Sequence, residues 1–144
     1  MSNISTYLEE LWLGMLKGVA ADPTSFTVYC GIANDTATPD EMEAGTLTNE
    51  ITGYEGDRKP ITFGEITQVG DPPDVKATIK NSAAIDFESM PAPDTKKVKY
   101  AIVCDSATKG EGNILYWCPL AELKTWNAGD TFRIPIDGLV LDLA

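Results

Sequence analysis

Two apolar runs, VKYAIVC at residues 98–104 and ILYWC at residues 114–118, give the clearest structural signal in this chain of 144 residues. Both runs are rich in β-branched and aromatic residues, which is typical of strands. The link between them, residues 105–113, contains Gly110 and Gly112 and favours a hairpin connection. The two runs therefore predict an antiparallel β-hairpin, and its first strand is the most apolar of the chain.

Short runs of similar character extend from this hairpin toward both ends of the chain. Glycine, proline, asparagine and aspartate separate them, and no helical pattern lies between any two. These further runs are residues 26–32, 60–63, 75–79, 84–87, 131–136 and 139–143. About seven to nine short strands at near-regular spacing predict a mainly β fold, an antiparallel β-sandwich or a jelly-roll-like barrel.

The segments between the strands carry their own predictions. Residues 34–45 are polar and acidic, so we expect a surface loop there, with one helical turn at residues 40–44. Residues 64–73 read as an excursion or an edge connection. Tyr116 and Trp117 are neighbours in a strand and must face opposite sides, so we expect one in the core and the other exposed or at an interface.

Residues 3–19 show the spacing of an amphipathic helix. Ser5 or Thr6 is the expected N-cap, and Gly18 with the Asp22-Pro23 pair supplies the stop. The apolar positions at helical spacing are Ile4, Leu8, Leu11, Trp12, Met15, Leu16 and Val19. We therefore divide the chain into an N-terminal helix with its connector, residues 1–22, and a β-sandwich domain, residues 23–144. The helix either packs across an opening of the sandwich or leaves it to bind a neighbour.

The amino-acid composition argues against a catalytic role and against nucleic-acid binding. Eleven basic residues against 22 acidic ones give a formal net charge of −11, which repels a phosphate backbone. The chain has no histidine, the commonest general base and a frequent metal ligand. We therefore expect a protein that is not an enzyme, with no catalytic residues, no cofactor and no direct contact with nucleic acid.

The cysteines and the N-terminal stretch bear on the cellular compartment. Cys30, Cys104 and Cys118 are odd in number and lie in apolar runs, so we expect buried thiols in a reducing compartment rather than disulfides. The first residues lack the features of a secretory signal, and no run approaches the length of a membrane span. These features predict synthesis in the cytoplasm and no membrane contact.

Clustered carboxylates raise the question of a metal site. Asp35, Asp40, Glu41 and Glu43 supply oxygen ligands but lack the register of a calcium loop, so we expect a solvated or structural loop and no metal. Acidic chains also produce chance pairs of carboxylates, such as Asp86 and Glu88, and none is singled out for acid-base work.

Two groups of residues are candidates for partner binding. Leu8, Leu11, Trp12 and Met15 lie on one stretch of the predicted helix, and Trp12 is equally compatible with a partner groove and with the domain's own core. Tyr54 in a turn, followed by Arg58, has the composition of an interface hot spot, although a packed turn aromatic is the simpler interpretation.

Taken together, these landmarks resemble a family of tailed-phage virion proteins, labelled tail-fibre-like or head-decoration proteins. The resemblance covers almost the whole chain. It rests on the helix at residues 8–16, the strand at residues 26–32, Thr52-Gly53-Tyr54 with Arg58, residues 61–63, 85–87 and 115–116, and the Ala128-Gly129-Asp130-Thr131-Phe132 turn with residues 139–143.

The resemblance implies a structural component of a phage particle, made in the host bacterial cytoplasm. The leading hypothesis is a capsid decoration or cement protein that binds the major capsid protein or other virion subunits as a small homo-oligomer, with a trimer as our guess. One alternative is a tail or fibre-associated structural protein. A third hypothesis, from another class, is a carbohydrate-binding adhesion module that uses exposed aromatic residues such as Trp117 or Trp126.

Overall fold

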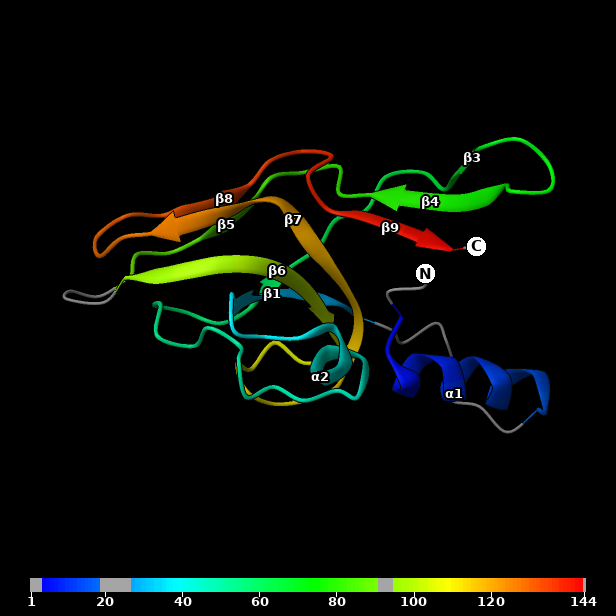
Figure 1. Cartoon of the computed structure of the whole chain (residues 1–144), viewed down its shortest axis with the longest axis horizontal. Coiled ribbons are helices and arrows are strands. Elements are labelled where there is room, and N and C mark those ends of the chain that lie inside the picture. Colours follow the sequence, from blue (N-terminus) through cyan, green and yellow to red (C-terminus); the bar gives the residue numbers. More distant parts are fainter. Residues whose placement is uncertain (1–3, 19–26, 91–94, 144) are drawn as a thin grey trace.

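The computed structural model describes residues 4–18, 27–90 and 95–143, and within them the protein is mainly β (Figure 1). The helices are α1 (Thr6–Leu16) and α2 (Pro39–Glu43). The strands are β1 (Tyr29–Asn34), β2 (Lys59–Pro60), β3 (Thr67–Val69), β4 (Lys76–Lys80), β5 (Ile85–Phe87), β6 (Lys96–Cys104), β7 (Ile114–Trp126), β8 (Phe132–Ile134) and β9 (Val140–Leu143).

Every strand pair in these residues is antiparallel, as the sequence predicts. One sheet has the order β2-β1-β6-β7, a second has the order β3-β4-β9, and β5 pairs with β8. The main core lies between these layers, where Val98 and Leu115 of the four-stranded sheet meet Phe87 and Ile134 of the two-stranded one. The arrangement is that of a sandwich, and the described strands close into no barrel.

The predicted hairpin is present, but its second strand is longer than expected. β6 pairs with β7, and β7 continues through Pro119 as far as Trp126. Proline is tolerated here because β7 is the edge strand of the four-stranded sheet. The register also shifts between Val98 and Tyr100, so the ladder is interrupted beside the proline.

The β6–β7 hairpin is covered on both faces. Tyr116 belongs to the main core, and Trp117 belongs to a second cluster with Tyr100, Ile102 and Met42 of α2. The expectation that one of the two aromatic neighbours would be exposed is therefore wrong, because α2 and its loops cover the outer face. α2 also confirms the predicted helical turn and begins with a capping box between Thr38 and Glu41.

Several predicted strands are shorter in the structure than in the sequence pattern. The run at residues 60–63 yields only β2 and an isolated bridge between Phe63 and Asn81, and the run at residues 131–136 yields β8. The segment at residues 64–73 contains the fully exposed edge strand β3. Phe26, the Asp22-Pro23 pair and the loop at residues 91–94 lie outside the described residues.

α1 confirms the predicted N-terminal helix and lies beside β7 (Figure 1). The Ser5 side chain is the N-cap and accepts a hydrogen bond from the Leu8 backbone N–H at 3.3 Å. The Ser5 backbone N–H donates to the Leu115 carbonyl at 3.0 Å, and Ile4 bridges to Tyr116. The first turn of α1 is therefore fastened to β7.

The three cysteines are buried free thiols, as the sequence predicts. Burial raises the pKa of Cys104 to about 12 and that of Cys118 to about 11. The pKa of Cys30 is also raised well above its ordinary value, by burial first and then by the two other thiols. All three side chains act as small apolar core residues.

Candidate interaction surface

α1 is apolar on almost every side, although most of its side chains remain accessible. Leu8 is buried against the core and Leu11 is half-buried, whereas Trp12 is 37% exposed. On the outward side Leu13 is 62% exposed and Leu16 is 85% exposed. Helices with so much apolar surface are normally buried. The apolar side chains of α1 that face solvent are therefore surface that a partner could cover.

An apolar groove separates α1 from the sheet formed by β3, β4 and β9. Its volume is about 350 Å³. α1 contributes Leu8, Leu11, Trp12 and Met15, the opposite wall consists of Phe63, Ile66, Ala77, Ile79, Leu141 and Leu143, and Val28, Val103, Leu115 and Tyr116 also line it. We call this feature the α1 groove.

The polar groups of the α1 groove already have partners inside the protein. The Thr78 hydroxyl donates to the Asp142 carboxylate at 2.7 Å. The Tyr116 hydroxyl donates to the Asp142 carbonyl at 2.7 Å and accepts from the Asp142 backbone N–H at 3.0 Å. The groove therefore offers mainly apolar contact area, and its described polar groups are held in hydrogen bonds within the protein.

The predicted partner-binding residues fall into two separate places. Leu8, Leu11, Trp12 and Met15 lie together and line the α1 groove. Tyr54 and Arg58 are elsewhere, and each is only 2% exposed. Partner contact at the helix residues stays a prediction, whereas Tyr54 and Arg58 present no accessible side chain in this structure.

Tyr54 is part of an aromatic core cluster. Its ring centroid lies 5.4 Å from that of Phe87 in an edge-on arrangement and 5.3 Å from that of Trp126. The Lys109 ammonium lies 4.1 Å from the Tyr54 ring centroid and donates to the Tyr54 carbonyl. Burial raises the pKa of Tyr54 and lowers that of Lys109. The turn aromatic is thus packed inside the domain and closed over by a lysine.

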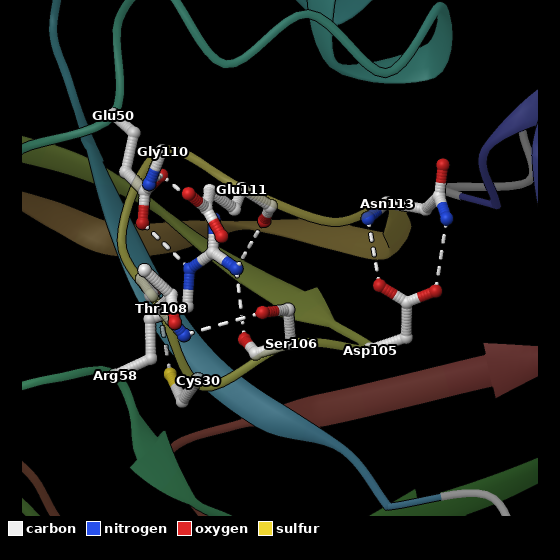
Figure 2. A network of polar contacts seen from close by, with 10 residues as sticks. Cys30, Glu50, Arg58, Asp105, Ser106, Thr108, Gly110, Glu111 and Asn113 are labelled. Carbon is white, nitrogen blue, oxygen red and sulfur yellow. Dashed lines mark hydrogen bonds and ion pairs between the residues drawn. The ribbon is translucent and has the colours of Figure 1, made fainter.

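Arg58 is the centre of a buried polar network, which Figure 2 shows. Its Nε and Nη2 atoms donate to the two Glu50 carboxylate oxygens at 2.7 and 2.8 Å. Its Nη1 atom donates to the carbonyls of Ser106 at 2.8 Å and Glu111 at 2.7 Å. Both side chains of the ion pair are fully buried.

The Arg58 network fastens the β6–β7 hairpin loop to the segment at residues 50–58. The Gly110 backbone N–H donates to Glu50 at 2.9 Å, and Asp105 closes the base of the loop by accepting two hydrogen bonds from Asn113 (Figure 2). Burial opposes the charge on Arg58, but the hydrogen bonds to Glu50 outweigh it and raise the pKa of Arg58 above its ordinary value. The guanidinium is therefore a structural tie, meaning that its hydrogen bonds hold the hairpin loop against residues 50–58.

Comparison with known families identifies the group to which the chain is similar. Residues 3–142 match the family model described as podophage GP4 fiber I protein gp80. The chain belongs to this family. A search of curated proteins found no match. The family assignment confirms the resemblance to tailed-phage virion proteins and makes the chain a structural protein of a bacteriophage virion.

Three of the carboxylates considered as metal ligands or as acid-base groups have structural partners in this fiber-family chain. Glu41 accepts from Thr38 in the capping box and from the Asn49 side chain at 2.8 Å. Asp86 pairs with Arg133 at 2.6 Å, and Glu88 pairs with Lys59 at 2.9 Å. Within residues 4–18, 27–90 and 95–143, no three histidine, cysteine, aspartate or glutamate side chains are grouped to hold a metal ion.

Two further features of this fiber-family protein come from the structure alone. The wall of the α1 groove opposite the helix, including Ile66 and Leu143, comes from segments that no sequence pattern places beside α1. Glu50, which pairs with Arg58, carried no signal of its own in the sequence. Finally, the helices in the described part of the chain are too short or too polar to span a bilayer.

Proposed function

We propose that this protein is a structural subunit of a phage tail or tail fibre and that it assembles with other virion subunits through the α1 groove. The family match carries the proposal, because it spans residues 3–142 and its description names a fiber protein. This description supports the tail or fibre alternative better than capsid decoration, the leading hypothesis from sequence. The role is non-catalytic, and the contacts include copies of the same chain.

The surface of α1 supports the mode of assembly. Leu13 and Leu16 are exposed on the outward side of the helix, and the groove on its inner side is lined almost entirely by apolar atoms. Contiguous exposed apolar surface of this kind marks interaction sites in soluble proteins. A partner that covers α1 would bury both sides and remove this surface from water.

Locating the protein in intact particles tests the first half of the proposal. Particles carrying this chain, imaged by cryo-electron microscopy or labelled with a specific antibody, are expected to show it on the tail or its fibres. Density confined to the outer surface of the head would contradict the proposal and return capsid decoration to first place.

A matched pair of variants tests the second half. Leu13→Lys with Leu16→Lys places two charges on the outward side of α1, and Leu123→Lys with Ile136→Lys makes the same change at exposed positions outside α1. We expect the α1 variant to lose self-association in sedimentation velocity and incorporation into particles, while the control assembles normally. Equal behaviour of the two variants would exclude α1 as the contact.

The adhesion hypothesis loses the residues first assigned to it. Trp117 and Trp126 are both buried, so neither can stack on a sugar ring without unfolding part of the core. Trp12 is the exposed tryptophan of the described residues, and it lines the α1 groove.

A further inference from the structure

Basic side chains are unevenly distributed in this acidic protein. Five of the 11 basic residues pair with carboxylates, namely Arg58, Lys59, Lys76, Lys124 and Arg133. Lys96, Lys97 and Lys99 are grouped within four residues at the start of β6. Among the residues that the structure describes, none of these three has a carboxylate within ion-pair distance.

Strand pairing adds a fourth lysine to this group. β7 runs antiparallel to β6, so its last residues lie beside the start of β6, and Lys124 is opposite Val98. The start of β6 and the end of β7 lie together at the end of the molecule that is farthest from α1 (Figure 1). We call Lys96, Lys97, Lys99 and Lys124 the lysine end, in which Lys124 alone pairs with a described carboxylate, that of Glu122 at 3.4 Å.

The backbone directs these ammonium groups to solvent. Val98 and Tyr100 are buried, whereas Lys97, Lys99 and Lys124 are exposed and Lys96 is half-buried. Relative to β1, Lys99 is the extra residue of a β-bulge, because Ala33 is opposite Tyr100 and Asn34 is opposite Val98. Lys97 and Lys99 are about 7 Å apart along the strand, as expected for alternate residues.

The residue types indicate the chemistry of the partner. Protein interfaces are enriched in arginine and aromatic residues and depleted in lysine, and the lysine end has neither an arginine nor an exposed aromatic residue. Lysine is a strongly hydrated point charge suited to single, separated anionic groups. At physiological salt the screening length is about 8 Å, so the lysine end acts locally despite the net charge of −11.

We propose that the lysine end binds an acidic polysaccharide, a polymer with well-separated carboxylate or sulfate groups. Duplex DNA carries one charge per about 1.7 Å, a density that four lysines do not neutralise. This site lies apart from the α1 groove, so its failure would leave the proposed assembly role intact.

Binding of alginate, a carboxylated polysaccharide, tests the proposal. Biolayer interferometry at about 50 mM and about 200 mM salt should show binding that weakens as salt rises. Lys97→Glu with Lys99→Glu should weaken binding by about tenfold or more. Lys17→Glu with Lys80→Glu changes the net charge equally at two other lysines without an ion pair, and binding should be nearly unchanged. Lys97→Gln with Lys99→Gln provides a milder variant if charge reversal affects folding.

Five outcomes would overturn the proposal, four of which concern alginate, dextran, the variants and DNA. These four are absence of alginate binding at low salt, equal binding of a neutral dextran, equal losses in the two charge-reversal variants, and tighter binding of duplex DNA. Tighter binding of polyglutamate would also overturn it and would instead assign the lysine end to an acidic polypeptide.

Discussion

The Arg58 network and the exposed faces of α1 have opposite structural roles, although both include residues that the sequence marked as candidates for partner contact. Around Arg58, the guanidinium donates to Glu50 and to two backbone carbonyls, and water is excluded. Around α1, Leu13 and Leu16 contact mainly solvent. A group whose hydrogen bonds and apolar contacts are all made within the protein stabilises the fold. A group that lacks such contacts is available to a partner, and residue type alone does not separate the two cases.

The comparison also explains why the buried ion pair is compatible with a stable fold. Taking two charges out of water costs several kcal/mol per ion, so such a pair gives little net stability by itself. Breaking it is another matter, because the remaining charge stays buried without a partner. The network therefore specifies the position of the hairpin loop more than it adds stability.

The largest expected effect comes from removing the guanidinium. Arg58→Ala leaves Glu50 buried without its partner and frees the Ser106 and Glu111 carbonyls, so we expect a loss of about 3–5 kcal/mol in the free energy of unfolding. Urea denaturation measures this value. Arg133→Ala breaks the exposed pair with Asp86 and serves as the control, with little change expected. Similar midpoints for the two variants would show that the network is not a structural tie.

Raising the pH should reduce the free energy of unfolding by a smaller amount, through ionisation of a buried core thiol. Burial raises the pKa of Cys118 from 9.0 to about 11, so above pH 9 the unfolded chain ionises while the folded protein keeps its proton. The free energy of unfolding should therefore fall between pH 9 and 11, by about 1.4 kcal/mol per pH unit for this thiol. Below pH 9 this contribution is fully present.

Cys118→Ala isolates that contribution. The substitution shifts stability at neutral pH by a constant amount and removes the titrating group, so its stability should decline less steeply than that of the wild type between pH 9 and 11. Denaturation curves at several pH values give both slopes. Parallel declines would show that the Cys118 thiol ionises equally in the folded and unfolded states.

The Tyr54 hydroxyl provides a finer test of the buried side of the comparison. Within the described residues this oxygen is buried and has no hydrogen-bond partner. Tyr54→Phe removes the unsatisfied group and keeps the ring contacts with Phe87 and Trp126. We expect a gain of up to about 1 kcal/mol in the free energy of unfolding. A clear loss of stability would mean that the hydroxyl has a partner, such as a buried water molecule.

The smallest effect on stability should come from the exposed side of α1. Leu16→Lys changes a side chain that is 85% exposed and places a cation at the C-terminus of the helix. We expect the free energy of unfolding of the monomer to change by less than about 0.5 kcal/mol. A large destabilisation would indicate that α1 is covered within its own subunit and would weaken the contrast with Arg58.

Local patterns in the sequence were sufficient for much of the fold. The apolar spacing at residues 3–19 predicted α1 and its Ser5 cap, the runs at residues 98–104 and 114–118 predicted the central hairpin, and the polar segment at residues 40–44 predicted α2. These features depend on side-chain periodicity and turn chemistry between near neighbours, which can be read along the chain.

The site could be predicted only in part. Leu8, Leu11, Trp12 and Met15 were identified together because they share one short helix. Their opposite wall comes from residues 63–66, β4 and β9, far along the chain, and no local pattern indicates that Ile66 and Leu143 face them. Tyr54 and Arg58 were named as candidates for partner contact, although a packed aromatic was the simpler interpretation of Tyr54. Their burial depends on contacts with Trp126 and Glu50 that no local pattern indicates.

The amino-acid sequence by itself determined that this protein is acidic, free of histidine and built mainly from antiparallel strands with one apolar helix at its N-terminus. The tertiary structure alone decided which apolar and charged side chains are covered. Burial depends on contacts between segments distant in the chain, and a residue's own type and neighbours carry no record of those contacts. For that physical reason Arg58 ends in the interior and Leu16 remains exposed to water.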